Sequence, residues 1–218
     1  MMVQPGISRV GCVARTAWRG GFAATLAMFV AALVSACVDP VTLATKAVAT
    51  TMPPMRWDHR PEAPRWTAAA LVAVAGRDDV LAGRVPADIA TWCPGYQSAS
   101  RADRRAFWVG MMSALAKYES SWNPGAAGGR GKWIGLMQIS PQTARQHGCT
   151  AQSAKALKSG EANLACAVRI FAAQVGHDGV VAGGGGRGMG RDWAPLHAAS
   201  KRAEMAAWTR VQPYCVKG

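Results

Sequence analysis

Hydrophobic residues recur at three- and four-residue steps in the middle of the chain. Between Arg101 and Glu119 they form one stripe, which is the spacing of one face of an α-helix: Phe107, Met111, Leu115 and Tyr118. Ser100 precedes this segment and Asp103 follows three residues later, an arrangement in which each side chain can satisfy an amide at a helix start. The pattern predicts a helix over residues 101–119.

Three later segments also have helical patterns. Pro141, preceded by Ser140, suits the first position of a helix that ends at Gly148. Residues 161–175 carry a stripe of Leu164, Val168, Phe171 and Val175, and residues 195–211 are helical in character. Glycine-rich loops are expected at 125–131 and 176–190, and only the short apolar segment 133–139 favours a strand. These patterns predict an α-rich (α+β) domain with at most a small β-hairpin.

The N-terminal pattern is a continuous apolar stretch. Arg9, Arg15 and Arg19 precede an uncharged run over residues 20–36, which is the layout of a secretory signal. A permanent membrane helix is the alternative, but 17 uncharged residues that include glycines, a threonine and a serine are marginal for a hydrocarbon core about 30 Å thick. We therefore expect export with removal of residues 1–36.

The apolar run ends in Leu33-Val34-Ser35-Ala36-Cys37, which resembles the lipobox of bacterial lipoproteins. The resemblance implies that Cys37 becomes a lipidated N-terminus, whose acyl chains hold the protein at a membrane; cleavage without lipidation is the alternative. Val38 follows, instead of the aspartate that retains many lipoproteins at the inner membrane of diderm bacteria. In a diderm host we expect attachment to the outer membrane, facing the periplasm.

The segment after Cys37 is rich in proline. Residues 38–65 hold five prolines among alanines and threonines without a sustained pattern, which predicts a tether. The apolar run from Trp66 to Ala75 is expected to pack as a short helix against the domain, or to be only partly ordered. A chain of 218 residues can bury one good core. The predicted organisation is a lipoprotein signal peptide (1–36), a tether with a short helix (37–86) and a single domain (87–218).

Cysteine number agrees with an oxidising compartment. Cys12 falls in the predicted signal and Cys37 would carry lipid, which leaves four cysteines: Cys93, Cys149, Cys166 and Cys215. Three pairings are possible, and we favour Cys149 with Cys166 as a local link and Cys93 with Cys215 as a link between the ends of the domain. Four buried thiols are the alternative. A zinc site is less favoured, because Cys-x-x-Cys and neighbouring histidines at ligand spacing are absent from the sequence.

The chain is strongly basic. Its net charge is +13, of which +10 remains after the three arginines of the predicted signal are removed. A basic surface attracts polyanions. An exported chain meets anionic cell-wall peptides and lipid head groups, and the sequence shows no nucleic-acid-binding motif. Solubility alone is the other interpretation of this charge.

Glu119 occupies an unusual position for a glutamate. It lies four residues after Leu115, on the apolar stripe and at the C-terminal end of the predicted helix. Partial burial and the negative end of the helix dipole both disfavour the ionised form, so both raise the pKa of this carboxyl towards that of an acid useful near neutral pH. A frayed helix end, with Glu119 paired to a basic residue, is the alternative.

Two segments around Glu119 resemble the soluble lytic transglycosylase family of the lysozyme-like superfamily. The first is Glu119-Ser120 followed by Asn123-Pro124, and the second, 16 residues later, is Gly135-Leu136-Met137-Gln138-Ile139 leading to Pro141-Gln142-Thr143-Ala144. A third likeness, Asn163-Leu164 with Cys166-Ala167-Val168, is similar to the helix that backs the cleft in that family. The family's Ala-Tyr-Asn segment is absent, and Trp193 stands in the region where it would occur.

The resemblance implies roles for individual residues. Glu119 is the expected acid and then base, Ser120 orients it or contacts substrate, and Gly135 lets backbone approach the sugar. Met137 is expected to line the cleft and Gln138 to bind an acetamido sugar, with ordinary core packing as the alternative for Met137. Trp193 is expected to stack on a sugar face, with a core position as its alternative. No cofactor and no metal are expected.

The resemblance also implies the reaction. A lytic transglycosylase cleaves the bond between N-acetylmuramic acid and N-acetylglucosamine in the glycan strands of peptidoglycan, and leaves 1,6-anhydro ends. Most glycosidases need two carboxylates. Only Glu119 is convincing here, because Asp103 is expected to cap a helix, Asp178 and Asp192 to flank a loop, and Glu161 and Glu204 to lie on solvated faces. A hydrolytic muramidase on the same scaffold and a non-catalytic lipoprotein that binds peptidoglycan are the alternative functions.

Overall fold

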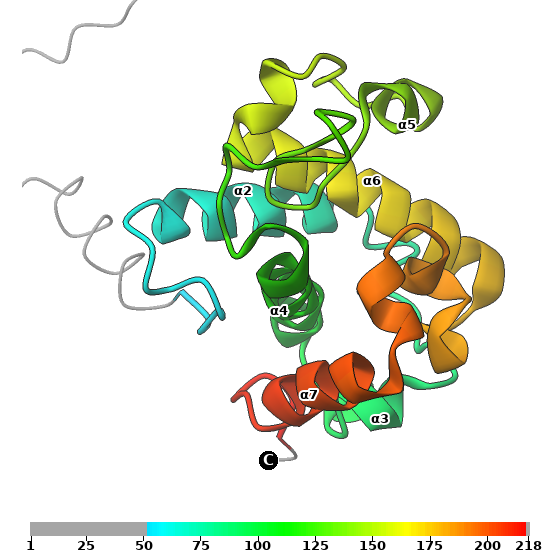
Figure 1. Ribbon diagram of the computed structural model, residues 1–218. Helices are drawn as coiled ribbons and strands as arrows, with labels where there is room; N and C mark the ends of the chain where they lie inside the picture. Colours follow the sequence, from blue (N-terminus) through cyan, green and yellow to red (C-terminus); the bar gives the residue numbers. More distant parts are fainter. Residues whose placement is uncertain (1–51, 217–218) are drawn as a thin grey trace, which may run out of the picture. The chain divides into compact units, whose positions relative to one another are not determined.

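The computed structural model describes residues 52–216, which form a helix-rich domain (Figure 1). The α-helices are α2 (Ala63–Ala75), α3 (Ile89–Trp92), α4 (Arg101–Ser120), α5 (Pro141–Gln146), α6 (Gly160–Asp178) and α7 (Ala199–Arg210). The strands β1 (Ala127–Gly128) and β2 (Trp133–Ile134) pair antiparallel, with Ala127 opposite Ile134. The predicted α-rich class with a small hairpin is confirmed.

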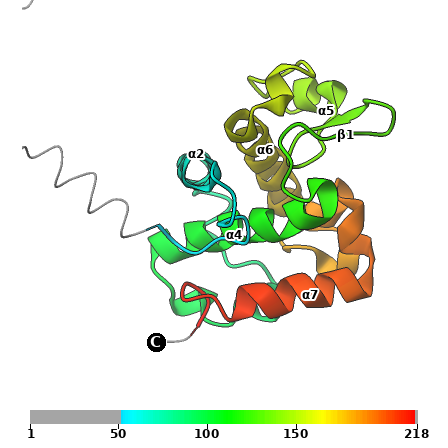
Figure 2. The same ribbon diagram turned by 60° about the vertical axis from the view of Figure 1, so that its left-hand side comes forward.

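Helix α4 is the central element of the domain. It lies between α2 and α7, and α2 also packs along α6 (Figures 1 and 2). Every residue from Ala106 to Ala116 is buried, so this helix is enclosed on all sides rather than on the single stripe that its pattern predicted. Phe107, Met111 and Leu115 are inaccessible to solvent, whereas Tyr118 is half-buried near the helix end.

The N-terminus of α4 is capped largely as predicted. The hydroxyl of Ser100 accepts a hydrogen bond from the amide of Asp103 (3.1 Å). The same hydroxyl donates to the Asp103 carboxylate (2.7 Å), which therefore binds the cap residue rather than a backbone amide. One helix amide is satisfied instead of two, but the helix still begins at Arg101 as expected.

The N-terminal boundary of the domain differs from the prediction. Residues 38–65 were expected to form a tether and the domain to begin near Ala87, yet Met55 and Trp57 are buried in the core. The indole of Trp57 donates a hydrogen bond to Thr67 of α2 (2.9 Å), and Arg56 forms an ion pair with Glu204. Aromatic side chains therefore override the proline-rich composition, and the folded unit begins no later than Met55. The apolar run 66–75 does form a packed helix, α2.

The signal peptide (1–36), the lipidation site Cys37 and residues 38–51 of the predicted tether lie outside the described residues. Within residues 52–216, no single helix is long and apolar enough to cross a membrane. Only α6 taken together with Gly183–Arg191, across a bend of 104°, passes the same test of length and composition.

Helix α6 packs against α2 and leads into the glycine-rich segment. The predicted stripe on α6 is buried throughout, and the helix runs three residues beyond Val175 to Asp178. The expected loop is organised into short 3-10 turns at Gly183–Gly185 and Gly188–Arg191. Asp88 fixes the first turn by accepting hydrogen bonds from the amides of Val181 (2.6 Å), Ala182 (3.0 Å) and Gly183 (2.9 Å).

Asp178 was expected to flank a loop exposed to solvent. Its side chain is only 4% exposed and forms an ion pair with Arg191, and it accepts a hydrogen bond from the amide of Gly188 (2.7 Å). The guanidinium of Arg191, followed by the His177 ring, holds the pKa of this carboxyl well below its usual range. Asp178 therefore closes the glycine-rich segment against the end of α6.

The remaining helices follow the predicted order with small changes at their ends. Ser140 caps α5 by accepting from the amide of Thr143 (3.0 Å), and the helix ends at Gln146, two residues before Gly148. The predicted C-terminal helix is divided at Ala198 into a 3-10 turn, Ala194–His197, and α7.

Both favoured disulfide pairings are present in the structure. Cys93 is joined to Cys215, which ties the segment before α4 to the segment after α7, and Cys149 is joined to Cys166 of α6. The Cα atoms are 4.6 Å and 5.2 Å apart. The longer link closes a loop of more than 100 residues, which restricts the unfolded chain strongly.

Candidate active site

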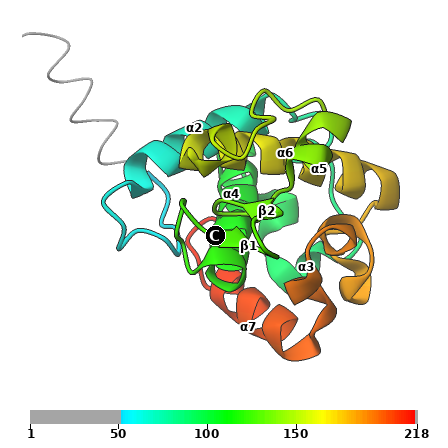
Figure 3. The ribbon, with the colours of Figure 1, turned by 45° about the horizontal axis from the view of Figure 1, so that its top comes forward.

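A cavity of about 440 Å³ lies at the C-terminal end of α4. The hairpin and the segment before α7 flank this helix end (Figures 2 and 3). The cavity is lined by Tyr118, Glu119, Trp133, Gln138, Asp192, Ala194, Pro195 and Lys201. Glu119 and Gln138, which the sequence singled out, thus share one cavity, together with residues that it did not single out.

Glu119 is the penultimate residue of α4 and is half-buried. Burial raises the pKa of its carboxyl to about 7, and the positive charge of Lys201 offsets a small part of this effect. A carboxyl with this pKa is substantially protonated at neutral pH and can also act as a base after it has lost its proton. The direction of this shift is the one that burial on the apolar stripe predicted.

The chain leaves α4 in a sharp turn directly after Glu119 and Ser120. Ser121 and Trp122 both adopt positive φ (50° and 58°). The indole of Trp122 donates to the carbonyl of Ser113 (2.8 Å), and its ring packs edge-on against His59 with centroids 4.6 Å apart. Two residues in a strained backbone region require such support from their surroundings.

Ser120 holds the end of α4 against the turn that follows the hairpin. Its hydroxyl donates to the carbonyl of Leu136 (2.9 Å) and also lies near the carbonyl of Ala116 (3.3 Å). Of the two roles predicted for Ser120, these contacts support orientation of the neighbouring Glu119. The hydroxyl is engaged within the protein.

Gly135 has a different role from the one predicted. It adopts φ = 80°, and a Cβ atom at this position would overlap the side chain of Asn163 and the carbonyl of Leu157. The residue is therefore required by close packing against α6 and the turn before it. Its amide donates to the carbonyl of Ala126 (2.9 Å) and its carbonyl accepts from the side chain of Gln138 (2.8 Å), so both groups are engaged within the protein.

Asn163 of α6 is fully buried and organises this turn. Its carbonyl oxygen accepts from the amide of Met137 (2.8 Å), and its amide group donates to the carbonyls of Ile134 (2.9 Å) and Leu157 (3.0 Å). The third segment of resemblance thus backs the site through a specific contact. The sequence predicted that this segment lies behind the cleft, but not that Asn163 holds the turn around Met137.

Met137 and Trp193 both belong to the core rather than to the cavity surface. Met137 is inaccessible to solvent, and Trp193 is 3% exposed. The indole of Trp193 donates to the carbonyl of Met137 (3.0 Å), and its ring meets Phe171 edge-on at 4.7 Å. The predicted substrate contacts of these two residues are therefore wrong, and the alternative of core packing holds for both.

Gln138 lines the cavity, but its side-chain amide is largely engaged within the hairpin. Its oxygen accepts from the amide of Gly128 (3.0 Å), and its nitrogen donates to the carbonyl of Gly135 (2.8 Å). With φ = 47°, Gln138 also occupies a left-handed backbone region. Its main contribution is to hold the hairpin beside Glu119.

Trp133 presents the main aromatic surface of the hairpin to the cavity. The side chain is 45% exposed, and the ammonium of Lys132 lies 5.3 Å from its ring centroid. A Cβ atom at Gly129 would overlap the Trp133 ring, so the glycine-rich turn packs directly on this indole. The sequence pattern predicted only a strand position for Trp133, because periodicity does not show which face of a strand meets a cavity.

Tyr118 joins the cavity to a charged cluster. Its hydroxyl donates to Glu204 (2.7 Å), which also binds Arg56 and Lys117, so Glu204 does not lie on a solvated face as expected. These partners, Arg56 first, lower the pKa of Glu204 to about 2. The ammonium groups of Lys117 and Lys201 lie 5.3 Å and 5.2 Å from the Tyr118 ring centroid. Of these cationic side chains, Lys201 is the one that lines the cavity.

Asp192 is a second carboxylate that lines the cavity. It was expected only to flank a loop. Its side chain is exposed and accepts a hydrogen bond from the amide of Gln174 (2.6 Å). Among residues 52–216, no group of three or more His, Cys, Asp or Glu side chains converges as a metal site would require.

Comparisons with known proteins agree with this arrangement. Residues 98–194 match the family model of the transglycosylase SLT domain. Two solved glutamate-to-glutamine mutants of Bd0314 DslA share 26% and 25% identity with this chain at a TM-score of 0.68, over 76% of this chain and 98% and 99% of theirs. A wild-type form of Bd0314 DslA shares 26% identity at a TM-score of 0.67, over 75% of this chain and 97% of its own. No curated protein sequence matches the chain. Residues 98–194 of the chain thus match a transglycosylase SLT domain, and the domain shares its fold with these solved structures.

Proposed function

We propose that this protein is a lytic transglycosylase that cleaves the bond between N-acetylmuramic acid and N-acetylglucosamine and forms 1,6-anhydro-muramoyl ends. The observation that carries the proposal is Glu119, a half-buried carboxyl in a cavity whose pKa is raised to about 7. A glycan strand is the substrate class of the matched domain family.

The proposed reaction uses Glu119 twice. In the first step its carboxyl gives a proton to the bridging oxygen as the bond from C1 of the muramic acid to that oxygen breaks. Positive charge then develops at C1 and at the ring oxygen. In the second step the Glu119 carboxylate takes the proton of the C6 hydroxyl, whose oxygen forms the new bond to C1. The carboxyl is regenerated, and water is not consumed.

The distribution of carboxylates favours this route over hydrolysis. The sequence has no aspartate or glutamate between Glu119 and Glu161, so the hairpin beside the cavity supplies none. An inverting hydrolase needs a second carboxylate to activate water, and a retaining hydrolase needs one as nucleophile. One carboxyl that changes role is sufficient for intramolecular closure.

Hydrolysis is the second candidate function, and Asp192 is the observation in its favour. Asp192 lines the same cavity as Glu119 and could serve as a base for water. Its hydrogen bond with Gln174 places one of its oxygens away from that task. Replacing Asp192 by Asn separates the two mechanisms, because it should abolish hydrolysis but leave ring closure in place.

Two further features support glycan binding. The exposed face of Trp133 offers an apolar surface on which a sugar ring can stack beside the reacting carboxyl. Lys201, at the start of α7, supplies a positive charge to the same cavity, where the carboxylates of peptidoglycan can be bound. A neutral sugar face and an acidic substituent would thus bind different side chains of the cavity.

The proposal is tested by digestion of purified sacculi and mass spectrometry of the products. Anhydro ends, lighter by one water than reducing ends, are expected from the wild type, and Glu119→Gln should abolish them while wall binding persists. Reducing ends alone would favour the muramidase, and binding without products would favour a non-catalytic role.

We also propose that the protein is exported and held in the cell envelope by lipid on Cys37, facing the periplasm from the outer membrane. The support is the lipobox-like sequence at the end of an apolar run. Cys37→Ala should move the protein from the membrane fraction to the soluble fraction, or leave it unprocessed. Unchanged membrane fractionation of a processed chain would argue against the lipid anchor.

A further inference from the structure

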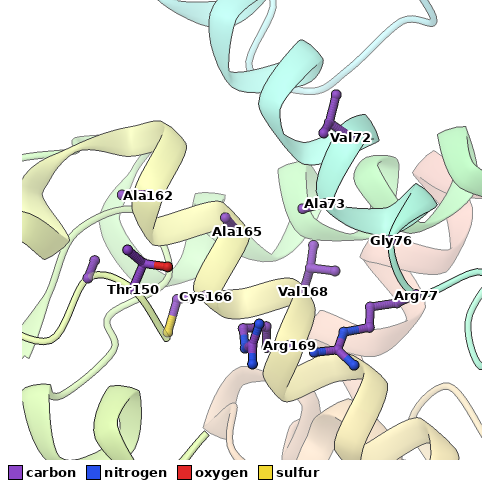
Figure 4. Close-up of a pocket in the computed structure, with 11 residues that line it drawn as sticks. Val72, Ala73, Gly76, Arg77, Thr150, Ala162, Ala165, Cys166, Val168 and Arg169 are labelled. Carbon is purple, nitrogen blue, oxygen red and sulfur yellow. The ribbon is translucent and has the colours of Figure 1, made fainter. Parts of the chain in front are cut away.

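A second groove, of about 500 Å³, lies between α2 and α6 (Figure 4). It shares no residue with the cavity around Glu119. Its lining comes from the last turns of α2, from the middle of α6 and from the short segment Thr150–Ala151 beside the Cys149–Cys166 disulfide. The disulfide joins that segment to α6, so this side of the groove is covalently held together.

The floor of this groove is formed by small aliphatic side chains. Ala73 on α2 faces Ala162, Ala165 and Val168 on α6, and Val72 at the edge is 75% exposed. Small side chains on both helices leave a shallow channel rather than a deep pocket for a large ring. Such a surface fits an extended chain that itself carries small side chains.

Two arginines mark one end of the groove. Arg77, just beyond α2, extends toward α6, and Arg169 of α6 lies at the same end of the groove (Figure 4). The Nε atom of Arg169 donates to the carbonyl of His147 (3.1 Å), which holds this guanidinium in place. Across residues 52–216, neither arginine forms an ion pair, and the groove has no acidic lining residue. Two guanidinium groups in this arrangement are suited to carboxylates.

We infer that this groove binds the stem peptide of peptidoglycan, with Arg77 and Arg169 binding its carboxylates and the aliphatic floor contacting its alanine side chains. The inference rests on the proposed function, because that function supplies a substrate with acidic, alanine-containing peptides attached to its glycan. Binding of the peptide outside the cavity would hold the wall near the enzyme while Glu119 acts on the glycan.

An acidic peptide fits the groove better than an anionic membrane surface does. Membrane-binding faces present several large apolar side chains together. Of the exposed large hydrophobic side chains in residues 52–216, only Val72 lines the groove; the others are Val85, Trp133, Val211 and Val216. The charge is therefore focused at one end of a channel rather than spread over an apolar face.

The inference is tested by isothermal titration of the full-length protein with the tetrapeptide L-alanyl-γ-D-glutamyl-diaminopimelyl-D-alanine. Arg77→Gln and Arg169→Gln should each weaken binding by about threefold to tenfold, the range for losing one partly exposed arginine-carboxylate contact. Arg210→Gln, which removes the same charge from an exposed position on α7, is the matched control and should leave the affinity unchanged. Thermal melts of all variants check that they are folded.

Equal affinity of the wild type and both groove variants, or absence of peptide binding to the wild type, would overturn the inference. So would a loss of binding to phosphatidylglycerol vesicles in these variants without an effect on the peptide. Cleavage of peptide-free glycan strands monitors the proposed function separately. Peptide binding without glycan cleavage would contradict only the proposed function, and cleavage without peptide binding would contradict only the groove.

Discussion

The raised pKa of Glu119 predicts an effect on stability that can be measured without any substrate. The carboxyl has a pKa of about 7 in the folded protein, against 4.5 for the unperturbed group. Below pH 4.5 it is protonated in both the folded and the unfolded states. Above pH 7 it is ionised in both, and the folded protein then bears the cost of a carboxylate that is poorly solvated.

The size of the effect follows from this difference in pKa. A shift of one pKa unit corresponds to about 1.4 kcal/mol, so the full shift of Glu119 costs about 3 kcal/mol of unfolding free energy above pH 7. Glu119→Gln removes the charge and nearly preserves the shape of the side chain. The variant should therefore be about as stable as the wild type near pH 4, and more stable by up to about 3 kcal/mol at pH 8.

Urea unfolding of both proteins between pH 4 and pH 8, with the disulfides intact, measures this difference. Glu161→Gln, on the first turn of α6, is a reference for the loss of one carboxylate elsewhere on this basic protein. A gain in stability for Glu119→Gln that does not grow between pH 4.5 and pH 7 would refute the argument that burial tunes this carboxyl. A loss of stability at pH 8 would do so as well.

Three other substitutions test separate parts of the site. Trp133→Ala should raise KM for glycan by about fivefold and change kcat less, since stacking on one face is worth about 1 kcal/mol; an unchanged KM would place the sugar elsewhere. Lys201→Met should raise the pKa of Glu119, because its charge favours the carboxylate, so the alkaline limb of the kcat/KM profile should move to higher pH; a move to lower pH would contradict this. Asn163→Ala leaves a buried amide and two carbonyls without partners and should lower the free energy of unfolding by about 2 kcal/mol, measured with denaturant. A change under about 0.5 kcal/mol would show that the turn has other support.

Local patterns were sufficient for most of the fold. The stripe ending near Glu119, the Ser100 cap and the Ser140-Pro141 start each depend on contacts within one helix, and the structure reproduces them. The position of Glu119 at the buried end of a helix followed from the same spacing. These features are predictable because each depends on neighbours within a few residues in the chain.

Long-range contacts account for the errors. Arg56 and Glu204 are 148 residues apart in sequence, so nothing local revealed their ion pair or the burial of the segment around Trp57. Proline-rich composition suggested a tether there, whereas buried aromatic side chains decide the structure. Such contacts depend on the packing of α4 against both α2 and α7.

The segment of residues 135–139 shows a second limit of prediction from sequence. Gly135, Met137 and Gln138 lie close to Glu119 in the fold, as their resemblance to the family implied, but they mainly build the turn rather than the cavity surface. A turn of a few residues has no period from which the exposed face can be inferred. For the same reason, Trp133 was not recognised as the exposed aromatic residue of the site.

The central claim is that Glu119 closes the muramic acid ring on itself without water. Digestion of sacculi in water enriched in the heavy oxygen isotope tests it most directly, because hydrolysis places one oxygen atom from the solvent at C1 of the new end. We predict anhydro-muramoyl products without solvent oxygen from the wild type and from Asp192→Asn. Products that carry one heavy oxygen at the muramic acid end would contradict the account.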